Sequence, residues 1–374
     1  MENQLIFRGE EGYSALRDHI VSAGYKRILL VCGRSLSATA AGRFFDKLTA
    51  ETGVEIVRFS GFSPNPDYDE AVSGVKLYRS TGCDAICGAG GGSAMDTAKC
   101  IKLFAQMPDD TDYVLQEIVP NDIPLIAVPT TAGTGSETTR FAVIYYHGAK
   151  FSVTHESCIP GAVLIDPDNL SSLPEHHRKC AMLDALCHAI ESFWSVGSTE
   201  ESRALSRKAI GMIMGSMDGY LAGDHSSAAD MLEAAFIAGQ AINITATTAG
   251  HAMSYKLTSG YGLAHGHAVA VCVPAVYRFL LDNTDKCSDP RGAEHLRRIL
   301  TGIPAMLGCP DTDSVVDMLS ALPEKLGLAA PQYSSDDELE VLADSVNAGR
   351  LKNNPVIPDR SEIKEMYRRI LRRK

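Results

Sequence analysis

Two different patterns of apolar residues divide this chain and limit the folds that it can adopt. Between residue 26 and about residue 130, short β-rich apolar runs alternate with amphipathic segments, and the runs read RILLVC, VEIVRF, DAICGAG and PLIAVPT. Strands that alternate with helices are typical of βαβ units and of a parallel sheet. From about residue 175 the pattern changes to long helical segments such as KCAMLDALCHAIESFW and AADMLEAAFIAGQAINIT.

The change of pattern predicts two domains. A chain of 374 residues exceeds the size at which a single core usually keeps growing. We expect an α/β nucleotide-binding domain with a parallel, Rossmann-like sheet over residues 1–174 and an all-helical domain over residues 175–374. The segment LIDPDNLSSLPEHH is the expected junction, because Pro, Ser, Asn and Asp interrupt regular elements.

Charge and hydropathy disfavour several classes of partner. The formal net charge of −11 argues against nucleic acid and anionic membranes, because either partner requires a basic face. No apolar run approaches the roughly 18 residues that span a bilayer, and the N-terminal residues do not resemble a secretion signal. We therefore expect a soluble, cytoplasmic protein. The ten cysteines are scattered, and Cys83 and Cys87 lie in an apparent buried strand, which indicates reduced core thiols.

Two glycine-rich segments follow expected strands. In GAGGGSAMDTAK, residues Gly90, Gly91, Gly92 and Ser93 form a candidate phosphate cradle, because glycine lets backbone N–H groups approach a pyrophosphate and a helix N-terminus favours negative charge. The spacing is neither GxGxxG nor a Walker A loop, so an ordinary glycine-rich turn is the alternative. The second segment, PTTAGTGSETTR, follows the strand PLIAV, and open α/β sheets bind ligands at the carboxyl ends of their strands.

Four residues in two helical segments could hold a metal ion. Asp184 and His188 are four positions apart in MLDALCHAIESFW, which places both on one face of a largely apolar helix. A buried carboxylate or imidazole is costly unless it is paired or metal-bound. In GHAMSYKLTSGYGLAHGHAVAV, we expect His251 on a helix that breaks around residues 259–260 and His265 at the start of the next helix. Three imidazoles and one carboxylate suit Zn²⁺ or Fe²⁺, although any one histidine alone is more often an ordinary core residue.

With these motifs in this order, the chain resembles the iron-containing alcohol dehydrogenases, the group III metal-dependent family, over nearly its whole length. The resemblance rests on GGGSAMDTAK, PTTAGTGSE, LIDP, DALCHAIE and NNPVIP, of which the last looks like the family's terminal NPR-type segment. It implies a dehydroquinate synthase-like fold with metal and nicotinamide in the cleft between the domains. It also implies an NAD(P)-dependent alcohol dehydrogenase or aldehyde reductase that forms a homodimer or a larger homo-oligomer.

The resemblance assigns roles to individual residues. The implied metal ligands are Asp184, His188, His251 and His265. NAD(H) is the favoured cofactor, but NADP(H) is not excluded, because Arg34 lies where NAD-preferring relatives often carry an Asp and could meet a 2′-phosphate. The implied cofactor-binding residues are Gly33, Arg34, Asn65, Gly91, Gly92, Ser93, Asp96, Thr130, Thr131, Thr134 and Lys150.

Further segments narrow the resemblance to the branch that contains phosphonoacetaldehyde and sulfoacetaldehyde reductases; they read FSGFSPNPDYDEAV, ETTRFAVIYY and SVTHES. Both substrates are two-carbon aldehydes with a terminal oxyanion. Candidate cations for that group are Arg140 and Lys256, which could equally be surface charges. A sulfonate carries a single negative charge and needs fewer cations than a phosphonate, so a site with few cations slightly favours sulfoacetaldehyde.

The expected reaction is hydride transfer from a nicotinamide to an aldehyde polarised by a divalent cation. The proton could come from His267, from water or from Tyr255, which replaces a further histidine found in many relatives. The alternatives are a lactaldehyde or other short-chain reductase, a glycerol dehydrogenase, a dehydroquinate synthase-like cyclase and a non-catalytic sensor of NAD or metal. The DxxxH spacing argues against the cyclase, and a sensor would leave four convergent ligands unexplained.

Overall fold

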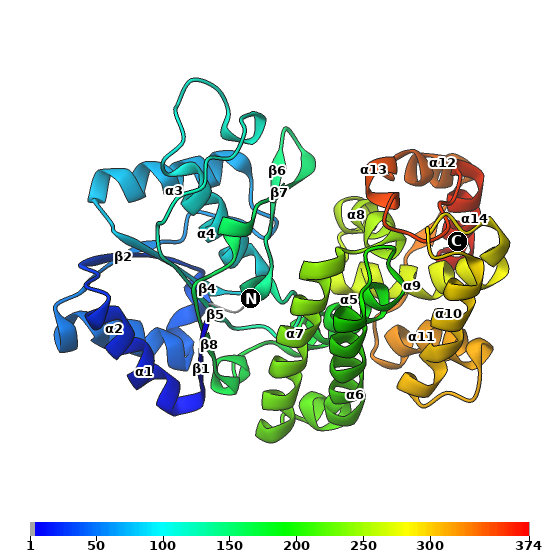
Figure 1. The fold of residues 1–374 in the computed structure, drawn as a ribbon, viewed down its shortest axis with the longest axis horizontal. Coiled ribbons are helices and arrows are strands. Elements are labelled where there is room, and N and C mark those ends of the chain that lie inside the picture. The colour runs from blue at the N-terminus through cyan, green and yellow to red at the C-terminus, as the bar shows by residue number, and fades with distance from the viewer. Residues whose placement is uncertain (1–3, 374) are drawn as a thin grey trace. The chain divides into compact units, whose positions relative to one another are not determined.

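The computed structural model describes residues 4–373, and the chain divides into two compact units (Figure 1). The first unit extends to Pro174 and includes Ala222–Phe236, and the second comprises Glu175–Leu221 and the chain from Ile237 onward. Helix α7 (His225–Thr245) therefore contributes to both units. The domain limits expected from the sequence stay a prediction.

A six-stranded parallel sheet forms the centre of the first unit, with the strand order β1-β8-β5-β4-β2-β3. Four of the strands coincide with the apolar runs of the sequence, which confirms the expected α/β fold with a parallel sheet. The sequence did not predict β1 and β8, which are only four residues long. The strands are β1 (Leu5–Arg8), β2 (Arg27–Cys32), β3 (Glu55–Phe59), β4 (Ala85–Gly90), β5 (Leu125–Pro129) and β8 (Ala162–Ile165).

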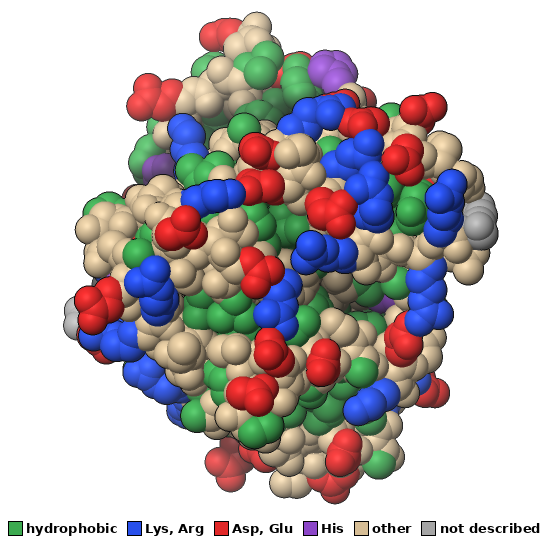
Figure 2. Space-filling view, turned by 90° about the vertical axis from the view of Figure 1, so that its right-hand side faces the viewer, with side chains coloured by type: hydrophobic (Ala, Val, Ile, Leu, Met, Phe, Trp, Pro, Cys, Tyr) green, Lys and Arg blue, Asp and Glu red, His purple; other side chains and the backbone are tan. Residues whose placement is uncertain are grey.

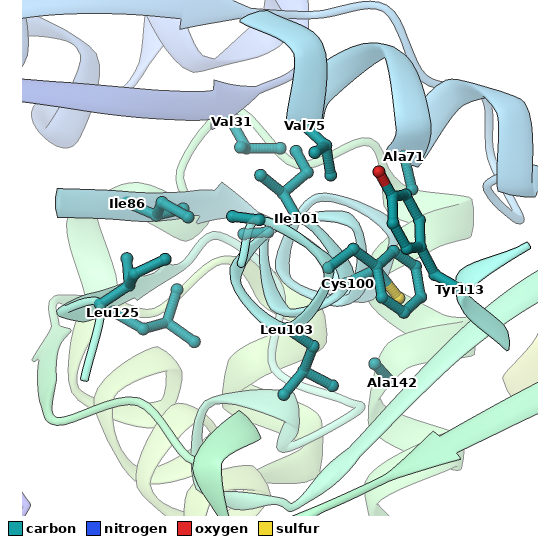
Figure 3. Close-up of a cluster of buried hydrophobic side chains, with 14 of the residues drawn as sticks. Val31, Ala71, Val75, Ile86, Cys100, Ile101, Leu103, Tyr113, Leu125 and Ala142 are labelled. Atoms are coloured by element: carbon teal, nitrogen blue, oxygen red, sulfur yellow. The ribbon is translucent and has the colours of Figure 1, made fainter. Parts of the chain in front are cut away.

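The two faces of the sheet bury separate apolar clusters. Alternate side chains of a strand point to opposite faces, so Val31 of β2 belongs to one cluster and Leu30 to the other. Figure 3 shows the first cluster, in which Val31 and Ile86 pack with Ile101 of the helix after β4. The ten cysteines are free thiols, in agreement with the expected reduced core. The connecting helices are α1 (Gly9–Ser22), α2 (Ala40–Thr52), α3 (Tyr68–Thr81) and α4 (Gly92–Phe104).

An antiparallel hairpin, β6 (Phe141–Tyr146) and β7 (Ala149–Thr154), forms its own two-stranded sheet in the first unit. Its turn residues His147 and Gly148 have φ values of 50° and 75°. Positive φ at both central residues is the conformation that matches the twist of hairpin strands. The sequence did not predict this hairpin, which carries Lys150.

The second unit is mostly helical, as the sequence predicted. A pair of two-residue strands, β9 (Gln332–Tyr333) and β10 (Arg372–Arg373), is the departure from an all-helical unit. Helix α8 continues through the expected break at residues 259–260, because the left-handed residue that ends it is Gly262, with φ of 70°. The helices are α5 (Glu175–Trp194), α6 (Glu200–Ala222), α8 (Ala249–Tyr261), α9 (His265–Asp282), α10 (Ala293–Leu307), α11 (Thr312–Lys325), α12 (Asp336–Asp344), α13 (Ala348–Leu351) and α14 (Arg360–Ile370).

The surface mixes charges of both signs. Figure 2 shows a face on which Lys and Arg side chains are interspersed with Asp and Glu. Both units carry ion pairs, for example Arg140 with Glu156 and Lys286 with Glu362, each at 2.8 Å. Within the described part of the chain, every helix is too short or too polar to cross a bilayer.

Candidate active site

The candidate cofactor residues gather at one edge of the parallel sheet. Gly33 and Arg34 follow β2, Asn65 follows β3, the loop Gly91–Ser93 follows β4, and the segment Thr130–Thr134 follows β5. These four strands are neighbours in the order β5-β4-β2-β3. Because all of them are parallel, their carboxyl ends share the edge where open α/β sheets bind ligands.

The loop after β4 leaves no room for side chains. Gly91 is the N-cap of α4, and a Cβ atom added to it would lie 3.2 Å from Cγ2 of Thr131. A Cβ atom on Gly92 would lie 2.9 Å from Cγ2 of Thr134. The backbone N–H of Thr130 donates to the carbonyl of Gly90 at 3.0 Å, which joins the two loops. The first N–H groups of α4 therefore remain accessible to an anion such as a pyrophosphate.

The loop after β3, which contains Asn65, also contacts the glycine loop. The N–H of Asn65 donates to Oγ of Ser93 at 3.3 Å. Asn65 has a φ of 61°, a left-handed conformation that asparagine tolerates better than most residues. The structure thus brings Asn65 beside the glycine loop.

Three further candidate cofactor residues, Asp96, Lys150 and Arg34, lie outside the glycine loop. Both carboxylate oxygens of Asp96 accept hydrogen bonds, from Oγ of Ser136 at 2.8 Å and from the N–H of Val143 at 3.1 Å. Asp96 therefore ties α4 to the hairpin; burial raises its pKa, and Lys99, the two hydrogen bonds and, least, Lys150 in β7 partly offset that increase. Arg34 is exposed at the start of a short 3-10 helix. The cofactor roles of these three residues, like those of the loops described above, stay predictions.

The four candidate metal ligands converge in the second unit. The Oδ1 atom of Asp184 lies 4.0 Å from Nε2 of His188, 3.6 Å from Nε2 of His251 and 3.9 Å from Nε2 of His265. Asp184 and His188 come from α5, His251 from α8 and His265 from the first position of α9. Ligand atoms of Asp184, His188 and His251 all lie within 4.8 Å of one another, and His265 is outside that compact group.

The ligand set is buried on one side and open on the other. The side chain of His265 is 31% exposed, whereas that of Asp184 is 4% exposed. Burial alone would raise the pKa of Asp184, but the imidazoles of His188, His265 and His251 hold it well below its usual value. Asp184 is therefore ionised at neutral pH, as a metal ligand must be.

Glu191, which the sequence analysis did not single out, fixes the orientation of His251. Its side chain is fully buried in α5, and Oε2 contacts Nδ1 of His251. Oε1 accepts from Oγ1 of Thr248, from the N–H of Thr248 at 3.2 Å and from the N–H of Gly250 at 2.9 Å, at the start of α8. A carboxylate that binds one imidazole nitrogen leaves the other for a metal.

The terminal NNP segment anchors the same helix. The amide nitrogen of Asn353 donates to the carbonyls of Thr245 and Thr247, and Oδ1 of Asn354 accepts from the N–H of Ala249 at 3.4 Å. This segment therefore fixes the start of α8, on which His251 lies two residues further along.

The candidate proton donors differ in their distance from the ligands. The ring of Tyr255 stacks on that of His265, with centroids 6.2 Å apart and an interplanar angle of 16°. His267 instead lies against the backbone of Leu328 and Ala329, and burial lowers its pKa. The structure brings Tyr255 next to His265, one of the candidate ligands, and places His267 against a different segment of the chain.

The candidate substrate cations are also in different environments. Arg140 donates to Oε1 of Glu156 at 2.8 Å, so a carboxylate already compensates its charge. Lys256 is half-buried on α8. Arg350, which no sequence motif indicated, donates from Nη1 to the hydroxyl oxygen of Tyr255 at 3.0 Å.

Two family models match the chain. The model described as "Iron-containing alcohol dehydrogenase" matches residues 3–167. The model described as "Fe-containing alcohol dehydrogenase family, C-terminal" matches residues 180–371. Together they cover both the glycine loops and the histidine cluster.

Individual relatives carry related names. The chain is 32% identical over 309 residues to a phosphonoacetaldehyde reductase of Streptomyces viridochromogenes, which covers 79% of this chain and 78% of the relative. It is 30% identical over 289 residues to a lactaldehyde reductase of Escherichia coli, covering 75% of each. A crystal structure of sulfoacetaldehyde reductase from Bifidobacterium kashiwanohense in complex with NAD⁺ superposes with a TM-score of 0.86 at 26% identity, covering 98% of this chain and 97% of that one.

The motifs, the fold and these matches agree. The parallel sheet with its glycine loops and the helical unit with its histidines each fall within one of the two family models. The chain belongs to the iron-containing alcohol dehydrogenase family and is an oxidoreductase that acts on alcohols or aldehydes.

Proposed function

We propose that this enzyme uses a divalent metal and NAD(P)H to reduce a short anionic aldehyde. The preferred substrate is sulfoacetaldehyde, which gives isethionate, followed by phosphonoacetaldehyde, which gives 2-hydroxyethylphosphonate. The observation that carries the chemistry is the approach of three imidazole Nε2 atoms to one carboxylate oxygen, Oδ1 of Asp184, at 3.6 to 4.0 Å.

These residues fit a metal ion. Oδ1 of Asp184 and Nε2 of His251 are buried and have no hydrogen-bond partner among the described residues. Such atoms cost about 1 to 3 kcal/mol each when they remain unsatisfied. Donors that are each about 2 Å from a tetrahedral ion lie roughly 3.4 Å from one another, close to the observed separations. We therefore assign Asp184, His188, His251 and His265 as the ligands of Fe²⁺ or Zn²⁺, both of which accept nitrogen and carboxylate oxygen.

The reaction converts an aldehyde, NAD(P)H and one proton into an alcohol and NAD(P)⁺. A cation in this site would supply Lewis acidity to the carbonyl group. The N–H groups of Gly91, Gly92 and Ser93 would hold the pyrophosphate of the nucleotide, and Glu191 keeps a proton on Nδ1 of His251. Tyr255 is the preferred route for the product proton because it lies beside His265.

The names of two relatives support the anionic substrate, since a phosphonoacetaldehyde reductase and a sulfoacetaldehyde reductase both resemble the chain over most of its length. NADH is the preferred reductant, in keeping with the NAD⁺ complex of the second relative. A homodimer or larger assembly remains a prediction that light scattering of the purified enzyme would test.

A general short-chain reductase is the second candidate, because the lactaldehyde reductase of Escherichia coli is 30% identical to this chain. A glycerol dehydrogenase, which oxidises a small polyol, is a further alternative of the same kind. The cyclase and the non-catalytic sensor are set aside, since the relatives are named as dehydrogenases and reductases.

Steady-state kinetics with a panel of aldehydes tests the proposal. The enzyme, loaded with Fe²⁺ or Zn²⁺, is assayed with sulfoacetaldehyde, phosphonoacetaldehyde, lactaldehyde and butanal, each with NADH and with NADPH. We expect kcat/KM for an anionic aldehyde to exceed that for butanal by about 100-fold, the value of a good charge-assisted contact. Equal efficiency with butanal would contradict the anionic substrate, and a preference for lactaldehyde would favour the second candidate.

A further inference from the structure

We propose that Arg350 binds the sulfonate or phosphonate of the substrate and thereby sets the preference for anionic aldehydes. The inference rests on the proposed function, because it names the residue that would recognise the charged end of the substrate. Arg350 takes the place of Arg140 and Lys256 as the principal cation.

Arg350 is tied to the metal ligands through one aromatic ring. Its guanidinium carbon lies 4.9 Å from the ring centroid of Tyr255, to whose hydroxyl oxygen Nη1 donates. The same ring stacks on His265. The guanidinium of Arg350 and the imidazole of the candidate metal ligand His265 therefore both contact the ring of Tyr255.

In the described part of the chain, Arg350 has no carboxylate partner. Among residues 4–373, no carboxylate lies within ion-pair distance of its guanidinium, and one of its five N–H donors, on Nη1, bonds to Tyr255. Arg140 differs, because it is paired with Glu156. A half-buried guanidinium with donors to spare favours an anion that can accept two parallel hydrogen bonds, as sulfonate and phosphonate oxygens can.

The separation suits a short substrate. The 4.9 Å and 6.2 Å separations place the guanidinium carbon at most about 11 Å from the centre of the His265 ring. A two-carbon aldehyde spans about 5 Å from its carbonyl oxygen to a terminal oxyanion. Charge-assisted hydrogen bonds of about 2.8 Å then reach the guanidinium while the carbonyl lies beside His265.

The test compares Arg350→Gln, Arg350→Lys and Lys256→Gln with the matched control Lys352→Gln, which removes one positive charge from an exposed position two residues away. In Arg350→Gln, we expect kcat/KM for sulfoacetaldehyde and phosphonoacetaldehyde to fall about 10- to 100-fold more than kcat/KM for butanal, mainly through KM, because loss of the hydrogen bond to Tyr255 affects all three aldehydes alike. Arg350→Lys should lose less, because lysine keeps the charge but not the forked geometry. Ethanesulfonate should inhibit the unaltered enzyme competitively and lose this effect in Arg350→Gln.

Two results would overturn the assignment while the proposed function stands. One is an equal loss on charged and uncharged aldehydes, which would show that Arg350 only packs on Tyr255. The other is an anion-specific loss in Lys256→Gln and none in Arg350→Gln, which would give the role to Lys256. If the unaltered enzyme has no preference for anionic aldehydes, the proposed function fails and the assignment fails with it. Metal content and the thermal unfolding temperature of each variant show whether the fold is retained.

Discussion

Replacing Glu191 by Gln tests whether the contact of this carboxylate with Nδ1 of His251 increases the affinity of the proposed site for a metal ion. The carboxylate is fully buried, contacts Nδ1 of His251 and accepts N–H groups from the start of α8. Gln keeps the shape but loses the negative charge, and it cannot accept through both ends of the side chain. Removing the partner of a metal-binding histidine typically weakens metal affinity about 10- to 100-fold, which corresponds to about 1.4 to 2.7 kcal/mol.

The assay is competition for Zn²⁺ or Fe²⁺ against a chromogenic chelator. The matched control is Glu201→Gln, the same chemical change at an exposed position of α6 in the same unit. We expect the dissociation constant for the metal to rise 10- to 100-fold in Glu191→Gln and to stay unchanged in the control, with part of the activity restored at high metal concentration. A metal affinity within twofold of the unaltered enzyme would refute the reasoning.

Three further predictions concern other parts of the molecule. His265→Ala should abolish turnover and weaken metal binding but leave NADH affinity, measured by nucleotide fluorescence, unchanged; near-normal activity without metal would defeat the mechanism. Gly92→Ala should raise the KM for NADH about 10-fold, because the new Cβ would lie 2.9 Å from Cγ2 of Thr134. The control Gly211→Ala, whose Cβ would have no neighbouring atom within 4 Å, should leave this KM unchanged. Equal KM values in the two variants would exclude this loop from nucleotide binding. Burial raises the pKa of Glu137 to about 7, so the folded state takes up a proton, and the stabilisation present below pH 4.5 is lost as the pH rises through 7. Glu137→Gln should therefore gain up to about 3 kcal/mol of unfolding free energy relative to the unaltered enzyme between pH 4.5 and 8 in denaturant titrations, and a difference independent of pH would contradict the shift.

The sheet was predictable where the sequence signal is local. Strands β2, β3, β4 and β5 are apolar runs bounded by turn residues, and their alternation with helices indicates a parallel sheet. Strand β1 pairs with β8 across more than 150 residues of chain, and each has only four residues, so neither carries a periodic signal of its own. The hairpin β6–β7 was missed although His147-Gly148 offered a turn signal between two β-rich runs.

Asp184 and His188 could be proposed as metal ligands from their helical spacing, and this role stays a prediction, whereas the residues that contact the candidate ligands were not identified. Glu191 carries a usable signal, since it follows Asp184 by seven positions and therefore lies on the same face of the apolar helix α5. Arg350 carries none, because it meets Tyr255 from 95 positions away and belongs to no recognised motif. Contacts of this kind depend on tertiary packing, which no local pattern encodes.

Anomalous diffraction from crystals of the metal-loaded enzyme, recorded at the iron or zinc absorption edge, tests the metal assignment most directly. We predict a single strong peak about 2.0 to 2.2 Å from Oδ1 of Asp184 and from the Nε2 atoms of His188, His251 and His265. A fully loaded, active enzyme whose anomalous peak lies elsewhere, or whose histidines point away from it, would contradict the account.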